Sequence, residues 1–253
     1  NGVSPCGHYI VSTRSRVDTV PVSVLIDRNG RELLTVETAD VSCLSSDWEW
    51  PEPVKLTGAD GKTEIHGVIF RPAGFSPDKS YAVIDYSCSP RNVSSLPQGS
   101  FVNSVFMGLD YLQSIAMAAL GFIVVAIEGR GTPLRNKAFQ DHHYGDHAYT
   151  NDFDDRIAGI RQLATRYSYM DLERVGITGH ENQTNSIYSL LKHSDFYKVA
   201  ILNCLYDPRF NIAALGETHD NTSDKTVVPK TVYPEDCVES FNGKLLLIQG
   251  MLS

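Results

Sequence analysis

The sequence lacks the patterns that would place it in several common functional classes. No apolar run is long enough to cross a membrane, and residues 1–5 look like a cut edge in a longer chain rather than a signal peptide. The net charge of −8 opposes binding to a nucleic-acid backbone. The five cysteines are far apart and form no Cys-x-x-Cys pair, so we expect no zinc site.

Two segments that resemble ligand-binding motifs lack essential parts. The Gly-Arg-Gly segment at 129–131 has no lysine–serine pair after it, so it is not a phosphate-binding loop. The histidine-containing segment at 141–147 has no helix with ligand spacing to hold it, which favours an ordinary loop. We therefore expect no metal and no cofactor. Arg130 is interpreted as a structural ion-pair partner of Glu128 or Asp155.

The composition is that of a packed globular protein, with 42% hydrophobic and 21% charged residues. Residues 1–46 have the pattern of strands, with extended runs at 8–12, 20–26 and 32–36. Between the last two runs, Asn29-Gly30 predicts a hairpin turn, because both residue types tolerate positive φ. A lone meander cannot bury both faces, so we expect it to pack on the main domain or to belong to a sheet upstream of Asn1.

Strands and helices alternate in the rest of the chain. Strands are predicted at residues 54–57, 65–71, 81–86, 122–127, 175–177, 199–202 and 245–248, and helices at 112–120 and 152–167. This alternation indicates a mostly parallel sheet in three layers. The continuous apolar run at 122–127 is typical of a strand that is buried on both faces. We expect the strand at Val175 to be central and the strand at Leu245 to lie at or near an edge.

The stretch 174–186 combines a short strand, a sharp turn and a helical pattern. This is the setting of the nucleophile elbow, Gly-x-Ser-x-Gly. Gly179 supplies the first glycine, but Glu181 stands at the serine position and Gln183 at the position of the second glycine. A carboxylate cannot be activated as an alkoxide, and Gln183 crowds a turn that needs small neighbours. The stretch therefore predicts a catalytic turn that has lost its chemistry.

Several motifs, in the same order, resemble the catalytic domain of the prolyl oligopeptidase family and in particular its dipeptidyl peptidase IV-like branch. They are Glu-Gly-Arg-Gly-Thr-Pro at 128–133, Tyr-Met-Asp-Leu-Glu-Arg-Val-Gly at 169–176 and Lys-Leu-Leu-Leu-Ile-Gln-Gly at 244–250. The resemblance implies an α/β-hydrolase domain over residues 47–253, incomplete at its C-terminus, with helices on both faces of the sheet. Residues 1–46 then resemble the end of the family's β-propeller, and a periplasmic or extracellular location is favoured.

The resemblance also implies where the site residues lie. Glu181 takes the position of the nucleophile and Ser253 that of the aspartate. The candidate oxyanion donors are Asn182, through its backbone, and Tyr86, with Ser87 as the alternative to Tyr86. The positions that wall the proline pocket in the family carry no aromatic side chain here; they are Asn211, Leu215 and His219.

Three functional hypotheses follow from these residues. The first is a catalytically inactive member of the peptidase family that serves as a structural or binding module for a peptide or protein partner. The second is an active serine exopeptidase that cleaves after proline and whose catalytic groups lie outside this chain. The third is a hydrolase that uses Glu181 as a carboxylate nucleophile. Because the predicted edge strand at Leu245 is apolar, we also expect a dimer or a partner that covers it.

Overall fold

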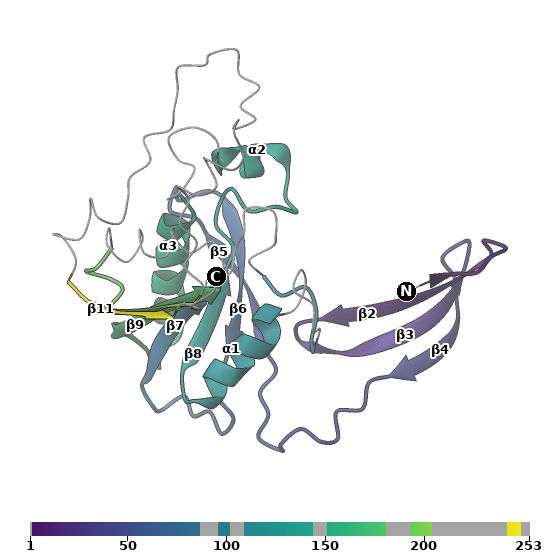
Figure 1. The fold of residues 1–253 in the computed structure, drawn as a ribbon, viewed down its shortest axis with the longest axis horizontal. Helices are drawn as coiled ribbons and strands as arrows, with labels where there is room; N and C mark the ends of the chain where they lie inside the picture. Colours follow the sequence, from purple (N-terminus) through teal and green to yellow (C-terminus); the bar gives the residue numbers. More distant parts are fainter. Residues whose placement is uncertain are drawn as a thin grey trace, which may run out of the picture.

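A computed structural model describes residues 2–86, 96–101, 109–143, 151–180, 193–203 and 242–248 of the chain. The strands in these residues form two sheets (Figure 1). The N-terminal sheet has four strands in the order β1-β2-β3-β4, and the large sheet has seven strands in the order β11-β10-β9-β7-β8-β6-β5. Within the described residues, no helix is both long and apolar enough to span a membrane.

The N-terminal sheet is an antiparallel meander, which confirms the strands predicted for this part of the chain. Its strands are β1 (Gly2–Val3), β2 (Tyr9–Arg16), β3 (Thr19–Asp27) and β4 (Glu32–Thr38). The two-residue β1 was not predicted, because so short a strand has no detectable alternation.

The hairpin predicted at Asn29-Gly30 joins β3 to β4, but only Gly30 has a positive φ, of 82°. The carbonyl of Asp27 accepts a hydrogen bond from the amide of Gly30 at 2.9 Å. The amide of Asp27 donates to the carbonyl of Arg31 at 2.9 Å. Its carboxylate also accepts from the amides of Asn29 and Arg31. The turn is therefore a three-residue loop that ends in a glycine bulge, and one left-handed residue is enough for it.

The large sheet is mostly parallel, as predicted. The strands β7 (Tyr81–Tyr86), β8 (Ile123–Ile127), β9 (Met170–His180), β10 (Val199–Asn203) and β11 (Lys244–Ile248) pair in parallel. The strands β5 (Glu52–Thr57) and β6 (Glu64–Phe70) are antiparallel to their neighbours. Among the described strands, β9 lies in the interior of the sheet and β11 at its edge, which confirms both predicted positions.

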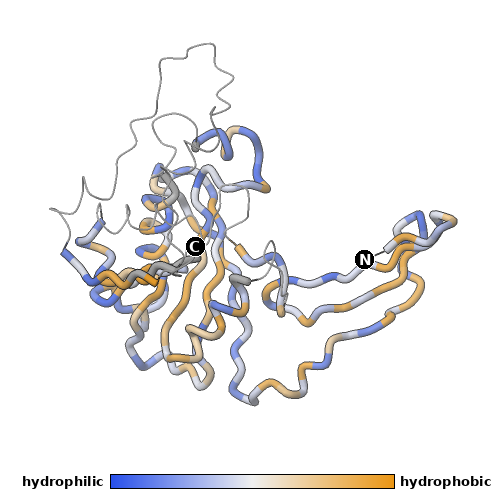
Figure 2. Tube along the Cα trace, in the orientation of Figure 1, coloured by the Kyte–Doolittle hydropathy of each residue, from blue (hydrophilic) through white to orange (hydrophobic). Residues whose placement is uncertain are grey.

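Helices cover both faces of the large sheet, as the alternation of side chains along β8 demonstrates. Val124 packs in a buried cluster with residues of α1 (Leu109–Ala119), whereas its neighbours on β8 pack in a second cluster with residues of α3 (Asn151–Arg166). Successive side chains of a strand point to opposite faces, so α1 and α3 lie on opposite sides of the sheet. All five residues of β8 are buried, and its strand region is strongly apolar in Figure 2. The three-layer prediction is confirmed.

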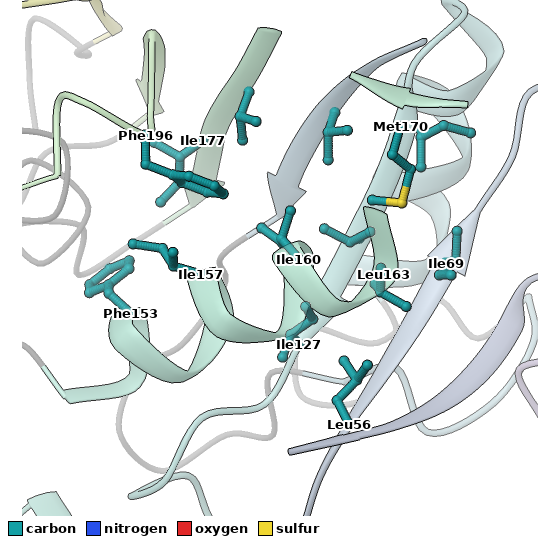
Figure 3. Packing of buried hydrophobic residues seen from close by; sticks show 14 of the residues in the cluster. Leu56, Ile69, Ile127, Phe153, Ile157, Ile160, Leu163, Met170, Ile177 and Phe196 are labelled. Atoms are coloured by element: carbon teal, nitrogen blue, oxygen red, sulfur yellow. The ribbon is translucent and has the colours of Figure 1, made fainter. Parts of the chain in front are cut away.

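The predicted helix at 152–167 corresponds to α3, and one face of it packs on the sheet (Figure 3). It presents Phe153, Ile157, Ile160 and Leu163 to side chains of the strands. Helix and sheet approach closely at Gly159, where an added Cβ would lie 3.0 Å from the Cδ1 atom of Ile127. Each large aliphatic side chain buried here contributes about 1.5–3 kcal/mol to stability. This packing fixes α3, and with it Asp155 and Arg156, against the strand ends.

Candidate functional site

The parallel strands β7, β8 and β9 end at the same edge of the large sheet. In the register of the sheet, Tyr86 at the end of β7 lies level with Thr178, near the end of β9. Open α/β sheets bind ligands outside the carboxyl ends of their strands. We therefore take this edge, the carboxyl edge, as the candidate site.

The predicted nucleophile position follows the central strand directly. β9 lies between β7 and β10 and ends at His180, and Glu181 is the next residue. Glu181 itself and Asn182 lie outside the described residues, as do Ser253 and the three pocket positions Asn211, Leu215 and His219. The roles assigned to these six residues stay predictions.

Tyr86 is the one predicted site residue that the structure describes. Its side chain is buried in the cluster on the α1 face of the sheet. Its hydroxyl donates a hydrogen bond to the Oε1 atom of Gln113 on α1 at 2.5 Å. The phenol is thus engaged within the packed interior, while Ser87, the alternative oxyanion donor, lies outside the described residues.

A fully buried ionic cluster lies beneath the carboxyl edge on the α3 face of the sheet, opposite the face that holds Tyr86. The sequence reasoning missed this cluster. Asp85 on β7 and Arg156 on α3 form a two-point ion pair. The Nε atom of Arg156 donates to the Oδ2 atom of Asp85 at 3.1 Å, and the hydroxyl of Tyr197 donates to the same oxygen at 2.7 Å. A charged residue next to the apolar stripe of α3 was the only signal of this cluster in the sequence.

The guanidinium of Arg156 also closes the ends of two strands. It donates to the main-chain carbonyl of Ile127 on β8 and to that of Tyr86 on β7, each at 2.8 Å. Carbonyls at strand ends have lost their partners in the sheet, and a buried carbonyl without a partner is costly. Arg156 therefore links the ends of β7 and β8 beneath the candidate site and, through Asp85, links them to Tyr197, which precedes β10.

A second ionic cluster anchors the segment 128–133 that follows β8. The guanidinium of Arg130 pairs with the buried carboxylate of Asp155 at 2.9 Å and with Asp60 at 3.2 Å. Asp155 also accepts hydrogen bonds from the backbone amides of Arg130 and Ala59, at 2.8 and 2.7 Å. This confirms the predicted role of Asp155, one of two alternatives, as the ion-pair partner of Arg130.

Glu128, the other predicted partner of Arg130, pairs with Arg135 instead. The Oε1 atom of Glu128 also accepts a hydrogen bond from the backbone amide of His66 at 3.1 Å. Burial raises the pKa of Glu128, although the positive charge of Arg135 opposes this shift. Of the two alternatives the structure thus selects Asp155, because the side chain of Glu128 turns towards β6 rather than along its own segment.

Metal-ligating side chains do not gather in the part of the chain that the structure describes. No group of three or more His, Cys, Asp or Glu residues with suitable geometry occurs there. The beginning of the histidine-containing segment forms a short 3-10 helix, Asp141–His143, after α2 (Lys137–Gln140). Residues 144–147 of that segment lie outside the described residues, so the prediction that it binds no metal stays a prediction.

Comparison with known proteins identifies the family. A model of the prolyl oligopeptidase family matches residues 109–252, which is more than half of the chain. The chain belongs to this family. Human dipeptidyl peptidase 8 is 28% identical over 216 residues, which cover 81% of this chain and 23% of the relative. The prediction of the dipeptidyl peptidase IV-like branch of this serine peptidase family is confirmed.

Two solved structures of family members share the fold. A Bacteroides ovatus protein provisionally assigned as a dipeptidyl aminopeptidase IV gives a TM-score of 0.75 at 21% identity, over 98% of this chain and 34% of that one. Dipeptidyl peptidase 4 of Porphyromonas gingivalis gives 0.70 at 21% identity, over 96% and 34%. These likenesses and the strand order confirm the α/β-hydrolase fold with its preceding meander. The chain spans about a quarter of the human relative and about a third of the solved chains.

Proposed function

We propose that this chain is a catalytically inactive member of the dipeptidyl peptidase IV-like branch that serves as a structural or binding module. One observation carries the proposal: the residue that directly follows the central strand β9 is Glu181, where the family has its nucleophilic serine. The carboxyl edge has a packed support in this chain, the buried ion pair of Asp85 and Arg156. The scaffold of the fold is therefore formed, while the residue type needed for serine chemistry is replaced.

The chemistry at this position requires a hydroxyl that a neighbouring base can deprotonate. A carboxylate has no such proton at neutral pH, so it cannot form an alkoxide. Gln183 replaces the second glycine of the elbow and Ser253 takes the aspartate position. The members of a catalytic triad act as one unit, so loss of one already removes most of the rate and further losses are not additive. Restoring a single member therefore recovers almost nothing.

A hydrolysis assay combined with active-site labelling tests the proposal. The protein is incubated with glycyl-prolyl p-nitroanilide and, separately, with a fluorophosphonate probe that labels activated serines. We expect neither chromophore release nor labelling, and we also expect no release by Glu181→Ser. Turnover well above buffer by the unmodified protein, abolished by a serine-directed inhibitor, would show that a serine other than the residue at position 181 is the nucleophile, and would support instead an active exopeptidase that cleaves after proline.

A hydrolase with Glu181 as nucleophile is the second candidate, because the residue after β9 is itself a carboxylate. A carboxylate oxygen attacks the carbonyl carbon of an ester, the bond to the alcohol breaks and the alcohol leaves, and water then hydrolyses the mixed anhydride that has formed. This candidate predicts turnover that is insensitive to fluorophosphonate and is lost in Glu181→Gln. If an ester panel gives no turnover that differs between the unmodified protein and Glu181→Gln, this function is excluded.

Residues 1–46 are proposed to be the end of a β-propeller that precedes the hydrolase domain of residues 47–253. What supports this is the apolar surface of the N-terminal sheet: Tyr9, Val11 and Leu34 are all exposed, and the register places Val11, Leu25 and Leu34 in one row across the sheet. Such a row needs another sheet to cover it. Binding of an apolar dye by the 253-residue chain, reduced in Leu34→Ser, is expected; a chain that binds no dye would contradict the proposal.

A further inference from the structure

The end of the β2–β3 hairpin enters the core of the hydrolase part. Val17, in the turn between these strands, is only 7% exposed. It belongs to the same buried cluster as Phe70 on β6, Tyr111 on α1 and Val124 on β8. In Figure 1 this end of the N-terminal sheet points towards α1 and the large sheet. The N-terminal sheet therefore supplies a side chain to the core that lies on the α1 face.

Ser100 binds the same hairpin by hydrogen bonds. It lies in the segment 96–101, between β7 and α1, and is 1% exposed. Its hydroxyl donates to the carbonyl of Thr19 at 2.5 Å, and its amide donates to the hydroxyl of Ser15 at 2.9 Å. The Oγ atoms of Ser15 and Ser100 are also 2.9 Å apart. One buried residue thus meets both strands of the hairpin, 81 and 85 positions away in the sequence.

Phe101 extends this contact to the segment that joins the two sheets. Its ring centroid lies 6.0 Å from that of Trp48 and 5.7 Å from that of Trp50, both of which precede β5. On the other side it lies 5.4 Å from the ring of Tyr111 on α1. Aromatic pairs at these separations stabilise a fold beyond the effect of the area that they bury. Phe101 therefore connects α1 with the segment that joins the sheets.

The N-terminal sheet has little core of its own. Of residues 2–38, all of which are described, only Val17 and Val24 are buried. A small sheet needs a covered hydrophobic face, or packing against another element, before it is stable in water. One of its two buried residues is the one that enters the hydrolase core. The folding of this sheet must therefore depend on the contact at its hairpin end.

We propose that Ser100 and Phe101 form a clasp that joins the N-terminal sheet and the large sheet into one cooperative folding unit. The clasp also fixes the segment 96–101 to the N-terminal sheet, so the position of that segment depends on the docked hairpin. The proposal concerns conformational coupling and does not depend on whether the candidate site is catalytic.

The two tryptophans of the chain make the clasp directly observable. Both contact Phe101, so tryptophan fluorescence reports on the clasp, whereas far-UV circular dichroism reports mainly on the helices that cover the large sheet. Guanidinium unfolding of the 253-residue chain is followed by both signals. We expect coincident transitions. A fluorescence transition that precedes the dichroism transition would show that the clasp opens independently, and would overturn the proposal.

Substitutions distinguish the clasp from an ordinary surface contact. Val17→Asp places a charge in the shared core, so we expect both signals to shift together and the Tm to fall by at least about 5 °C. Val36→Asp is the matched control, because Val36 lies on the same sheet and is 53% exposed; its Tm should change by less than about 2 °C. If Val17→Asp leaves the dichroism transition in place, the two sheets are independent and the proposal fails.

A milder variant covers the case in which Val17→Asp does not fold. Ser100→Ala removes the hydrogen bond to the carbonyl of Thr19 and keeps the bond from the backbone amide to Ser15. We therefore expect the midpoints of thermal unfolding, followed by fluorescence and by dichroism, to fall together by roughly 2–6 °C. Ser46→Ala, at an exposed serine in the segment between the sheets, should leave both midpoints unchanged. A Ser100→Ala variant with the stability of the Ser46→Ala control would show that no clasp exists at Ser100.

Discussion

Two buried tyrosines in one core cluster offer a matched test of hydrogen bonding in this protein. Tyr86 and Tyr111 both lie in the cluster on the α1 face, and they are 2% and 0% exposed. The hydroxyl of Tyr86 donates to Gln113, whereas the hydroxyl of Tyr111 has no hydrogen-bond partner among the described residues. Burial raises the pKa of Tyr111, in keeping with an environment that does not solvate the phenolate. The same substitution, Tyr→Phe, should therefore have opposite effects at the two positions.

The expected magnitudes follow from what each hydroxyl does. A buried polar group without a partner costs about 1–3 kcal/mol, so Tyr111→Phe should raise the free energy of unfolding by about 1–2 kcal/mol. The ring contacts with Phe70 and Phe101 are kept, because only the hydroxyl is removed. At Tyr86 the net contribution of a hydrogen bond, about 0.5–1.5 kcal/mol, is lost. In a protein of this size 1 kcal/mol corresponds to about 2–4 °C in Tm.

Differential scanning calorimetry and guanidinium unfolding of both variants provide the test. We expect Tyr111→Phe to melt above the unmodified protein by roughly 2–6 °C and Tyr86→Phe to melt below it by roughly 2–5 °C. Most core substitutions destabilise, so an increase at Tyr111 is a demanding prediction. Equal losses of stability in both variants would refute the reasoning, since they would mean that the hydroxyl of Tyr111 is bound, for example by a buried water molecule.

Three further predictions concern the ionic clusters and the exposed edge. Arg156→Met should lower the free energy of unfolding, measured in urea, by about 3–5 kcal/mol, because it leaves Asp85 charged and buried. The control Arg14→Met, at an exposed ion pair, should change it by less than about 1 kcal/mol. Similar losses of stability in the two variants would contradict this prediction. Hydrogen bonds from Thr63 and Lys62 and the charge of Arg130 hold the pKa of Asp60 well below its usual range. A depressed folded pKa gives stability that is present above the unfolded value, about pH 4, and is lost as the pH falls below it. Asp60→Asn should therefore flatten the dependence of Tm on pH in the acid range, and an unchanged acid slope would exclude this role. Because Leu246 and Ile248 on the edge strand β11 are exposed, we expect the chain to associate as a dimer or with a partner; light scattering that shows a stable monomer with this edge uncovered would argue against association.

The N-terminal part shows how far a local pattern can be trusted. The three longer strands of the meander and the Asn29-Gly30 turn were predictable, because alternation and turn residues act over a few positions. The burial of Val17 was not, because a single valine in a turn is normally exposed. Its environment is made by α1 and by strands of the large sheet, which lie far away in the sequence.

Some features of the candidate site were also predictable from the sequence, and others were not. That Glu181 follows a central strand was predictable from the sequence, because the apolar runs at 122–127 and 175–177 have the length and composition of buried parallel strands. The sequence also determined the family, through motifs that are contiguous in the chain. These features depend on neighbouring residues, so a linear pattern is sufficient to predict them.

Which charged groups form pairs depends on the three-dimensional fold. Arg156 pairs with Asp85, 71 residues away, and Tyr197 reaches the same carboxylate from a distance of 112 residues. The choice of Asp155 over Glu128 as the partner of Arg130 depended on how α3 docks against the end of β8. Local periodicity does not encode such pairs. They form because the fold brings the ends of β7 and β8 and the residues that precede β10 together in a buried space, where a charge must find a partner.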